Sequence, residues 1–330
     1  MDNYECENVR IIAPSRLHFG LFGWGPEAEM QFGGMGVMIS QPCFELEVAR
    51  AESNEFSVPA DQRDKYRNIY NSCRDYLRER DIKLPQLHFK LIDAPQPHIG
   101  LGSGTQRALS VAAAVAKIVG YEIRSVTDLA EMARRFPRSG VGVHGFSQGG
   151  LIIDGGHASG LGGHQQIAPL LARRDWPEDW QVLLVSPHEP EGFSNEIEQN
   201  AFRILPPPSK GDMNAVKREV FDHLLTSIDK LQFSAALQAI ESIQRIVGSW
   251  FAPSQSGSIY GTPFRDQLVR QMKKAGLQGV GQSSWGPTLF GFAEANKIDE
   301  IEARLFRDNA ISQSMVKIIR TTVHNQPTLT

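Results

Sequence analysis

The chain has 330 residues, of which 41% are hydrophobic and 22% charged, and its formal net charge is −3. This length and composition can supply a continuous buried core for one large or two ordinary domains, so we expect a globular protein. Lysine and arginine form no run longer than a pair, which excludes the basic surface typical of proteins that bind nucleic acid.

The three cysteines, Cys6, Cys43 and Cys73, lack the spacing of a zinc site or a disulfide framework, which favours a reducing compartment. The amino terminus is acidic and polar, unlike a signal peptide, and no stretch has the length and apolar character of a membrane span. We therefore expect a cytoplasmic protein with neither a membrane nor a nucleic acid as partner.

Strands and helices are expected to alternate along the first half of the chain, because the period of the hydrophobic residues changes between two and 3.6. The predicted strands cover residues 9–23, continuing into a glycine-dense stretch up to Gly36, and residues 44–50, 87–93 and 149–157. The predicted helices cover residues 64–80, 107–120 and 125–136, the last with Ser125 as its N-cap.

The second half of the chain is richer in long helical patterns. In chain order we expect a strand at 180–187, a helix at 195–205, a linker at 206–212, helices at 213–230, 233–250 and 264–274, a strand-turn-strand at 277–292, a helix at 298–306 and a strand at 315–323. The predicted strands and helices alternate in blocks of unequal size, which favours α+β layers over a regular parallel βαβ sheet.

A glycine-rich loop before the helix expected at 107–120 is the strongest chemical signal in the sequence. Gly100, Gly102 and Gly104 alternate with Leu101, Ser103 and Thr105, so that several backbone amides and hydroxyls can converge at the amino end of a helix. Such an arrangement favours a bound phosphate, because glycine lets the backbone approach closely and the helix dipole attracts negative charge. The spacing is neither a Walker A motif nor a dinucleotide fingerprint, and a plain glycine turn capped by Ser103 is the alternative.

The motif PHIGLGSG, residues 97–104, closely resembles the central motif of the GHMP kinases, which phosphorylate galactose, homoserine, mevalonate and related substrates. APSRLHFGLFG and GVGQSSWGPTLFGF resemble the amino-terminal and carboxy-terminal motifs of the same superfamily, in the same order. The resemblance implies an α+β fold with a ribosomal protein S5 domain 2-like domain over residues 1–178, a ferredoxin-like domain over residues 179–330, and an active site between them.

Within that superfamily, four segments resemble the β-ribofuranosylaminobenzene 5′-phosphate synthases. They are SRLHFGL (15–21), GLGSGTQ (100–106), GGLIIDGG (149–156) and GQSSWGP (281–287). The resemblance implies condensation of phosphoribosyl pyrophosphate with 4-aminobenzoate, releasing carbon dioxide and pyrophosphate, as an early step toward methanopterin-type carriers. It also implies Mg²⁺ but no ATP, and a homodimer, although no residue identifies the ligands of the metal or the dimer interface.

The superfamily pattern is broken at Gly142. Several GHMP kinases carry a catalytic aspartate in an SGxD-like stretch, which would align with residues 139–142. Its absence favours the synthase over an ATP-dependent small-molecule kinase, and a member that binds a ligand without turnover is the third hypothesis. Asp154 is a spatial substitute for that carboxylate or, as we favour, an aspartate that caps a turn.

Candidate site residues follow from the motifs. Arg16 and His18 occupy alternate positions of a predicted strand, so their side chains share one face, and arginine suits phosphate or carboxylate. The amides of GLGSGTQ, including Gln106, are expected to bind phosphate, with Ser103 or Thr105 able to serve the metal or the phosphate.

The remaining candidates lie in glycine-dense segments. His144 and Gln148 belong to VGVHGFSQGG, which we interpret as a loop lining the site, with His144 a weaker candidate for acid or base catalysis than His18. Ser284 and Trp285 are candidates for contact with the ribose or the aromatic ring, the alternative for Trp285 being a tryptophan of the core.

Overall fold

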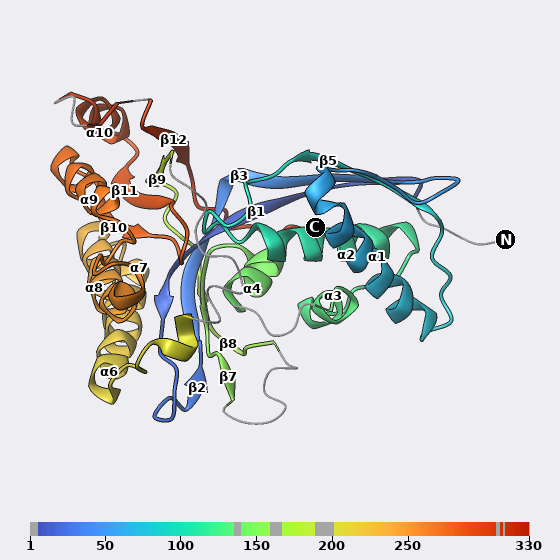
Figure 1. Ribbon diagram of the computed structural model, residues 1–330, viewed down its shortest axis with the longest axis horizontal. Coiled ribbons are helices and arrows are strands. Elements are labelled where there is room, and N and C mark those ends of the chain that lie inside the picture. Colours follow the sequence, from blue (N-terminus) through green and yellow to red (C-terminus); the bar gives the residue numbers. More distant parts are fainter. Residues whose placement is uncertain are drawn as a thin grey trace.

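In the computed structural model, the described residues are 6–134, 140–158, 167–188, 201–307, 311–312 and 314–329, and they form two sheets with helices around them (Figure 1). A long antiparallel hairpin of β1 (Asn8–Leu21) and β3 (Gly34–Arg50) is the centre of the first sheet. β3 pairs through its second half with β5 (Leu87–Asp93) and through its first half with β6 (Leu151–Asp154). The sheet is completed by β4 (Glu55–Ser57) parallel to β5, and by β8 (Leu170–Arg174) beside β6.

Four helices cover one face of this sheet (Figure 1). They are α1 (Arg63–Arg78), preceded by a 3₁₀ turn (Ala60–Gln62), α2 (Ser103–Ile118), α3 (Val126–Met132) and α4 (Gly140–Gln148). α2 is the most deeply buried because its alanine-rich sequence lets it pack closely on every side. A two-stranded ribbon of β2 (Met30–Gln31) and β7 (His157–Ala158) lies at the edge.

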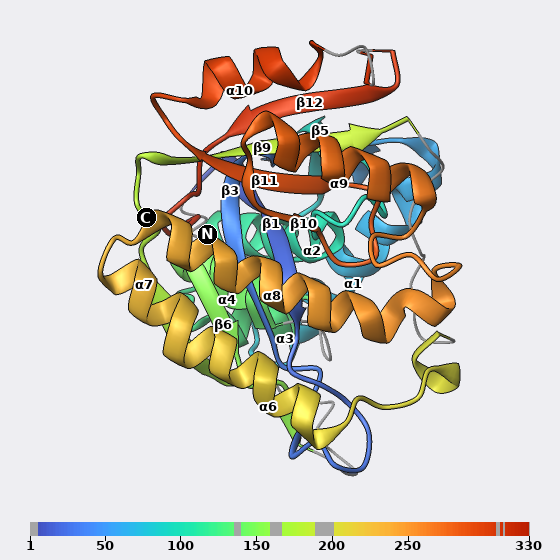
Figure 2. The same ribbon diagram turned by 90° about the vertical axis from the view of Figure 1, so that its left-hand side faces the viewer.

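The second sheet has the antiparallel order β10–β11–β9–β12. Its strands are β9 (Trp180–Pro187), β10 (Gln278–Gln282), β11 (Leu289–Glu294) and β12 (Val316–Thr321). α9 (Pro263–Ala275) and α10 (Ile298–Leu305) pack together beside the sheet. The other long helices, side by side in Figure 2, are α6 (Lys210–Arg218), a π-helical segment (Glu219–Leu224), α7 (Leu225–Asp229), and α8 (Phe233–Phe251) followed by a 3₁₀ turn (Ala252–Ser254).

The largest hydrophobic cluster joins the two sheets rather than belonging to either. It combines Leu17 and Phe19 of β1 with Leu184 of β9, Phe290 of β11 and Ile243 of α8. The buried Gln244 of α8 reinforces this junction, because its amide donates to the carbonyl of Phe19 while its oxygen accepts the amide of Gln282, 2.8 Å away. The relative position of β1 and β10, and of the motifs they carry, is therefore fixed by shared packing.

The α+β fold class expected from the sequence is confirmed, and most helices and strands lie where they were predicted. The loop predicted around His144 and Gln148 is wrong, because residues 140–148 form α4. α2 begins at Ser103 rather than at 107, and β8 was not anticipated. The helix expected at 195–205 lies largely outside the described residues, and the division at residue 178 stays a prediction, although the chain leaves the first sheet after Arg174 and enters the second at Trp180.

Across the described parts of the chain, no helix combines the length and the apolar character that crossing a bilayer requires.

Replacing Gln244 by alanine should lower the free energy of unfolding by about 1–3 kcal/mol, because two buried backbone groups lose their partner. Urea denaturation of the variant would measure the loss. Gln238→Ala, on the exposed side of the same helix, is the matched control and should change stability little. Equal effects of the two substitutions would contradict the bridging role of Gln244.

Candidate active site

Arg16 lies on β1 just after a β-bulge, beside the glycine loop. Its amide donates to the carbonyl of Leu101 at 3.1 Å. A Cβ atom added to Gly102 would lie 2.6 Å from Arg16 Cγ, and one added to Gly142 would lie 3.8 Å from Arg16 Cδ. The side chain therefore passes between the amino-terminal turns of α2 and α4, and the two glycines make room for it.

The amino end of α2 has the properties of an anion site. Its N-cap, Gly102, has a left-handed backbone with φ of 72°, which a glycine adopts without strain. The first turn, from Ser103, carries no acidic residue, and no side chain of the described residues caps it. Because the first amides of a helix lack partners within the helix, and because Ser103 and Gly104 are only half-buried, this positive end is accessible to a ligand.

The amino end of α4 is instead occupied by a carboxylate of the protein itself. Asp154, at the end of β6, is fully buried and accepts the amide of Val141 at 3.0 Å. It also accepts the amides of Gly156 at 2.9 Å and of Gly34 at 3.3 Å. The capping interpretation of Asp154 is thus confirmed. Of the two helix ends beside Arg16, that of α4 is neutralised by Asp154, whereas the first turn of α2 carries no acidic residue.

Ser283 connects three of the motifs singled out in the sequence. Its hydroxyl donates to the carbonyl of Gly100 at 2.8 Å and accepts the amide of His18 at 3.1 Å. The amide of Ser284 donates in turn to the carbonyl of His18 at 3.3 Å. Gly100 and Gly286 approach so closely that a Cβ on Gly286 would lie 2.2 Å from the Gly100 nitrogen. The second sheet therefore supports the glycine loop from behind.

Burial determines the charge states at this site. Desolvation, and then the positive charge of Arg16, hold the pKa of His18 well below its ordinary value, so its ring is neutral at pH 7. Desolvation raises the pKa of Asp154 to about 6, against the opposing effects of its three amide partners and Arg16. At neutral pH the charged side chains identified here are thus Arg16 and Asp154.

The structure brings together most of the residues predicted for the site. Arg16, His18, Gly100, Gly102, Ser103, Gly104, Thr105 and Ser284 all lie around the amino end of α2 or in the segments that touch it. The Cβ position of Gly142 is 3.3 Å from Thr105 Cγ2, so α4 closes the same region from another side. The predicted proximity of Arg16 and His18 also holds, because the charge of Arg16 acts on the His18 ring.

Gln106 and His144 are both buried and both bonded to backbone carbonyls. Gln106 is fully buried and donates to the carbonyl of Gly142 at 3.1 Å, which ties α2 to α4. His144 follows Gly142 by about 200° around the helix axis, and its Nε2 lies 2.7 Å from the carbonyl of Ala168. Burial lowers the pKa of His144, with the bond to Ala168 opposing it. Both residues have structural contacts that account for their positions.

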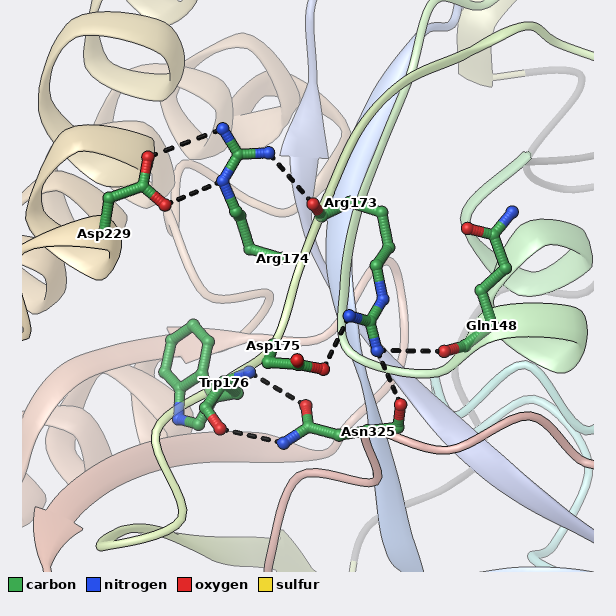
Figure 3. A network of polar contacts seen from close by, with 7 residues as sticks. All are labelled: Gln148, Arg173, Arg174, Asp175, Trp176, Asp229 and Asn325. Atoms are coloured by element: carbon green, nitrogen blue, oxygen red, sulfur yellow. Dashed lines mark hydrogen bonds and ion pairs between the residues drawn. The ribbon is translucent and has the colours of Figure 1, made fainter.

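Gln148 lies at the far end of α4, about 9 Å along the helix axis from Gly142. Figure 3 shows that its backbone carbonyl, rather than its side-chain amide, accepts a bond from Arg173, at 3.1 Å. The same guanidinium donates to the carbonyl of Asn325 at 2.6 Å, and the side chain of Asn325 pairs with the backbone of Trp176. Gln148 therefore belongs to the anchoring of the carboxy-terminal segment, not to the surroundings of the glycine loop.

Trp285 is 7% exposed and its ring centroid lies 4.3 Å from that of Phe251 and 5.7 Å from that of Phe202. It belongs to an aromatic cluster that continues to Trp24 and Trp250. These contacts favour the core interpretation of Trp285.

Two residues that organise the site were not among the predicted site residues. Ser283 stands beside Ser284 in the same motif, and only the tertiary structure distinguishes adjacent serines in a turn. Asp154 was treated as a turn residue without a link to Arg16. The sequence does contain a signal for Asp154, because its carboxylate directly follows a predicted buried strand and precedes two glycines. A carboxylate buried at such a position needs a hydrogen-bond or charged partner.

The described residues contain no group of three or more histidines, cysteines, aspartates or glutamates that could hold a metal ion. Asp154 is committed to three amides. The hydroxyls of Ser103 and Thr105 remain as oxygen donors at the glycine loop. Such a site suits Mg²⁺ carried mainly by substrate phosphates, since this ion often takes few protein ligands and keeps several waters.

Comparison with solved structures identifies the fold class. The chain superposes on homoserine kinase from Cytophaga hutchinsonii with a TM-score of 0.69, over 98% of this chain and 96% of that one, at 16% identity. For mevalonate diphosphate decarboxylase from Enterococcus faecalis the TM-score is 0.67, covering 97% of each chain, also at 16% identity. The protein therefore has the GHMP-kinase fold.

Sequence comparison gives a closer resemblance, although no family model matches. The chain is 28% identical over 299 residues to a beta-ribofuranosylphenol 5'-phosphate synthase of Methanothermobacter thermautotrophicus, covering 86% of this chain and 88% of the relative. A protein of the same name from Archaeoglobus fulgidus is 26% identical over 297 residues, with coverages of 87% and 88%. The resemblance to ribofuranosyl 5′-phosphate synthases expected from the four motifs is confirmed.

Gly102→Ala should weaken the binding of inorganic pyrophosphate by at least about tenfold, because the new methyl group displaces Arg16 and strains the N-cap of α2. Titration calorimetry would measure the affinity. Gly257→Ala is the matched control: its φ of 83° imposes similar backbone strain, but nothing lies within 4 Å of the added Cβ. Retained pyrophosphate affinity in Gly102→Ala would contradict the placement of the anion site.

Proposed function

We propose that the chain transfers the phosphoribosyl group of phosphoribosyl pyrophosphate to the ring carbon of 4-aminobenzoate that bears the carboxylate, releasing carbon dioxide and pyrophosphate. The observation that carries this proposal is the amino end of α2, whose first turn carries no acidic residue and is half-buried, and which is adjacent to Arg16. The similarity to ribofuranosylphenol 5′-phosphate synthases supports a product of this type. The reaction would be an early step toward a methanopterin-type carrier, as the resemblance of the four motifs implies.

In this reaction the bond between the anomeric carbon and the pyrophosphate oxygen breaks, and negative charge accumulates on the leaving group. The amides of α2 and the guanidinium of Arg16 point positive charge at that position, which lowers the barrier because they are held in place beforehand. Mg²⁺, when bound with the Ser103 or Thr105 hydroxyl among its ligands, would neutralise further charge on the pyrophosphate.

The acceptor ring forms a carbon–carbon bond to the anomeric carbon and then loses its carboxylate as carbon dioxide. The electron pair of the broken bond restores the aromatic ring, so no proton has to be added or removed. A reaction without proton transfer suits a site in which His18 is neutral and Asp154 is fully buried. The protein contributes chiefly by orienting the two substrates and excluding water.

The identity of the acceptor is open to a direct test. 4-Hydroxybenzoate differs from 4-aminobenzoate in one polar atom and would give a ribofuranosylphenol product, as the names of the similar proteins specify. Parallel assays with phosphoribosyl pyrophosphate, magnesium and either acid, without ATP, should release carbon dioxide and pyrophosphate in equal amounts with one or both acids. No release from either acid, together with ATP consumption when alcohols are offered, would replace the proposal with a small-molecule kinase.

Arg16→Ala should reduce turnover in this assay by about 100-fold or more, because a fixed cation that stabilises developing charge is lost. Its thermal unfolding should stay close to that of the original protein, which would separate loss of function from loss of fold. Arg10→Ala, which removes an exposed arginine of the same strand that pairs with Glu45, is the matched control and should retain activity. Near-normal turnover of Arg16→Ala would remove Arg16 from the mechanism.

A further inference from the structure

Asp154 is unusual among the carboxylates of the described residues because it has no exposed surface, yet its contacts are made only with backbone amides and with the field of one cation. Its three amide donors belong to three separate segments: Gly34 at the start of β3, Val141 in the first turn of α4, and Gly156 beyond β6. Arg16 is the charged side chain that favours its ionised form. The carboxylate thus holds together the backbone on one side of Arg16.

Two features of the described residues act on Arg16. The charge of the buried Asp154 carboxylate interacts with that of Arg16, and Gly102 at the amino end of α2 is in contact with the arginine side chain. A phosphate or sulfate bound at α2 would attract the same guanidinium. The anion and the Asp154 carboxylate would then be two negative charges that share one arginine.

We propose that Asp154 is the positioning residue of this anion site and that it takes up a proton when an anion binds at the amino end of α2. The inference rests on the proposed function only in taking that helix end as the place where the substrate phosphates bind. Asp154 does not touch the ligand; it acts through the electrostatic coupling of its carboxylate to Arg16 and through the first turn of α4, whose Val141 amide it holds.

The direction of the coupling follows from electrostatics. A bound anion draws Arg16 away from Asp154 and adds a negative charge nearby, and both effects favour the neutral carboxylic acid. Since burial already raises the pKa of Asp154 to about 6, a further rise brings its protonation into the neutral range. Below pH 6 the free protein already carries the proton, so binding takes up none. Above pH 6 binding must draw a proton from solution, so anion affinity falls as pH rises.

Other titratable groups near Asp154 need to be separated from it. His18 of β1 has its ring against Gly34, where an added Cβ would lie 2.8 Å from Nε2, and Gly34 donates to Asp154. His144 of α4 is bound to the carbonyl of Ala168, whose side chain adjoins the Asp154 side chain across Gly140. His157 of β7 is buried three residues further along the chain. Substitution of each histidine removes its contribution to proton uptake.

The test is titration calorimetry of the whole chain with sulfate, which stays a dianion over the range used, in two buffers of different ionisation enthalpy. At pH 7.5 the original protein should take up a substantial fraction of a proton for each sulfate bound. Its sulfate affinity should fall by roughly fivefold to tenfold between pH 6 and pH 7.5, since proton linkage allows at most about tenfold for each pH unit. The Asp154→Asn variant should take up no proton when sulfate binds. Its sulfate affinity should change by less than about twofold between pH 6 and pH 7.5.

The controls identify the source of the proton. Asp175→Asn removes a mostly exposed carboxylate paired with Arg173 and should leave the uptake intact. His18→Asn, His144→Gln and His157→Gln should also keep it, and loss of the uptake in any of these histidine variants would overturn the assignment to Asp154. Unchanged uptake in a folded Asp154→Asn variant would overturn it as well.

If Asp154→Asn does not fold, difference infrared spectroscopy of the original protein replaces it. Sulfate binding at pH 7.5 should then produce the absorption of a buried, protonated carboxyl group, and its absence would overturn the proposal. Failure of the turnover assay with the coupling intact would refute the reaction alone, whereas turnover without coupling would refute the role of Asp154. Sulfate that does not bind at any pH would remove the anion site itself and, with it, this inference.

Discussion

The positive charge of Arg16 between two helix amino ends is the constraint on which the rest of the site depends. A guanidinium beside the positive ends of α2 and α4 is unfavourable unless anions accompany it. Among the described residues, Asp154 is an anion that acts on Arg16, and it lies behind α4, where it accepts three backbone amides. The first turn of α2 has no acidic residue. This difference between the two helix ends underlies the proposed phosphate site at α2.

Close approach of neighbouring segments explains several glycines in and beside the four motifs. Arg16 passes between Gly102 and Gly142, and Gly286 lies directly against Gly100. Gly140 adjoins the side chain of Asp154, with an added Cβ only 2.7 Å from that of the aspartate. A methyl group at any of these contacts would push apart segments that bring charge or backbone amides to one place. The glycine-rich motifs are therefore the packing surfaces of the site.

This also explains which parts were predictable from the sequence. Helices such as α1 and α8 carry long apolar stripes, and β9 is a continuous apolar run, so local periodicity predicts them. α4 carries three glycines, which predict a loop by propensity, yet it is helical because those glycines pack against Thr105, Asp154 and Met38. Tertiary packing there overrides the weak local preference.

In the candidate site, too, local sequence patterns predict some features and only tertiary contacts determine the others. The glycine loop and the Arg16/His18 pair are visible in the sequence because their residues are close along the chain. The bonds of Ser283 to His18 and Gly100 join positions separated by 265 and 183 residues, and the bond of Gly34 to Asp154 spans 120. No local pattern reports such pairs. His144 and Gln148 were drawn into the predicted site by the loop interpretation, and the helix turns them toward Ala168 and the carboxy-terminal segment instead.

The position of Asp154 fits the proposed group transfer better than phosphorylation. A carboxylate at position 142, the place that aligns with the kinase aspartate, would start from a Cβ 3.8 Å from Arg16 Cδ and 3.3 Å from Thr105. It would face the substrate side and pair with Arg16, leaving less positive charge for a pyrophosphate leaving group. With glycine at 142 and the carboxylate on β6 behind the helix, α4 is still capped while Arg16 keeps its access to the amino end of α2. The carboxylate is then an internal counter-ion rather than a base aimed at a substrate hydroxyl, and the proposed transfer, which moves no proton, needs no such base.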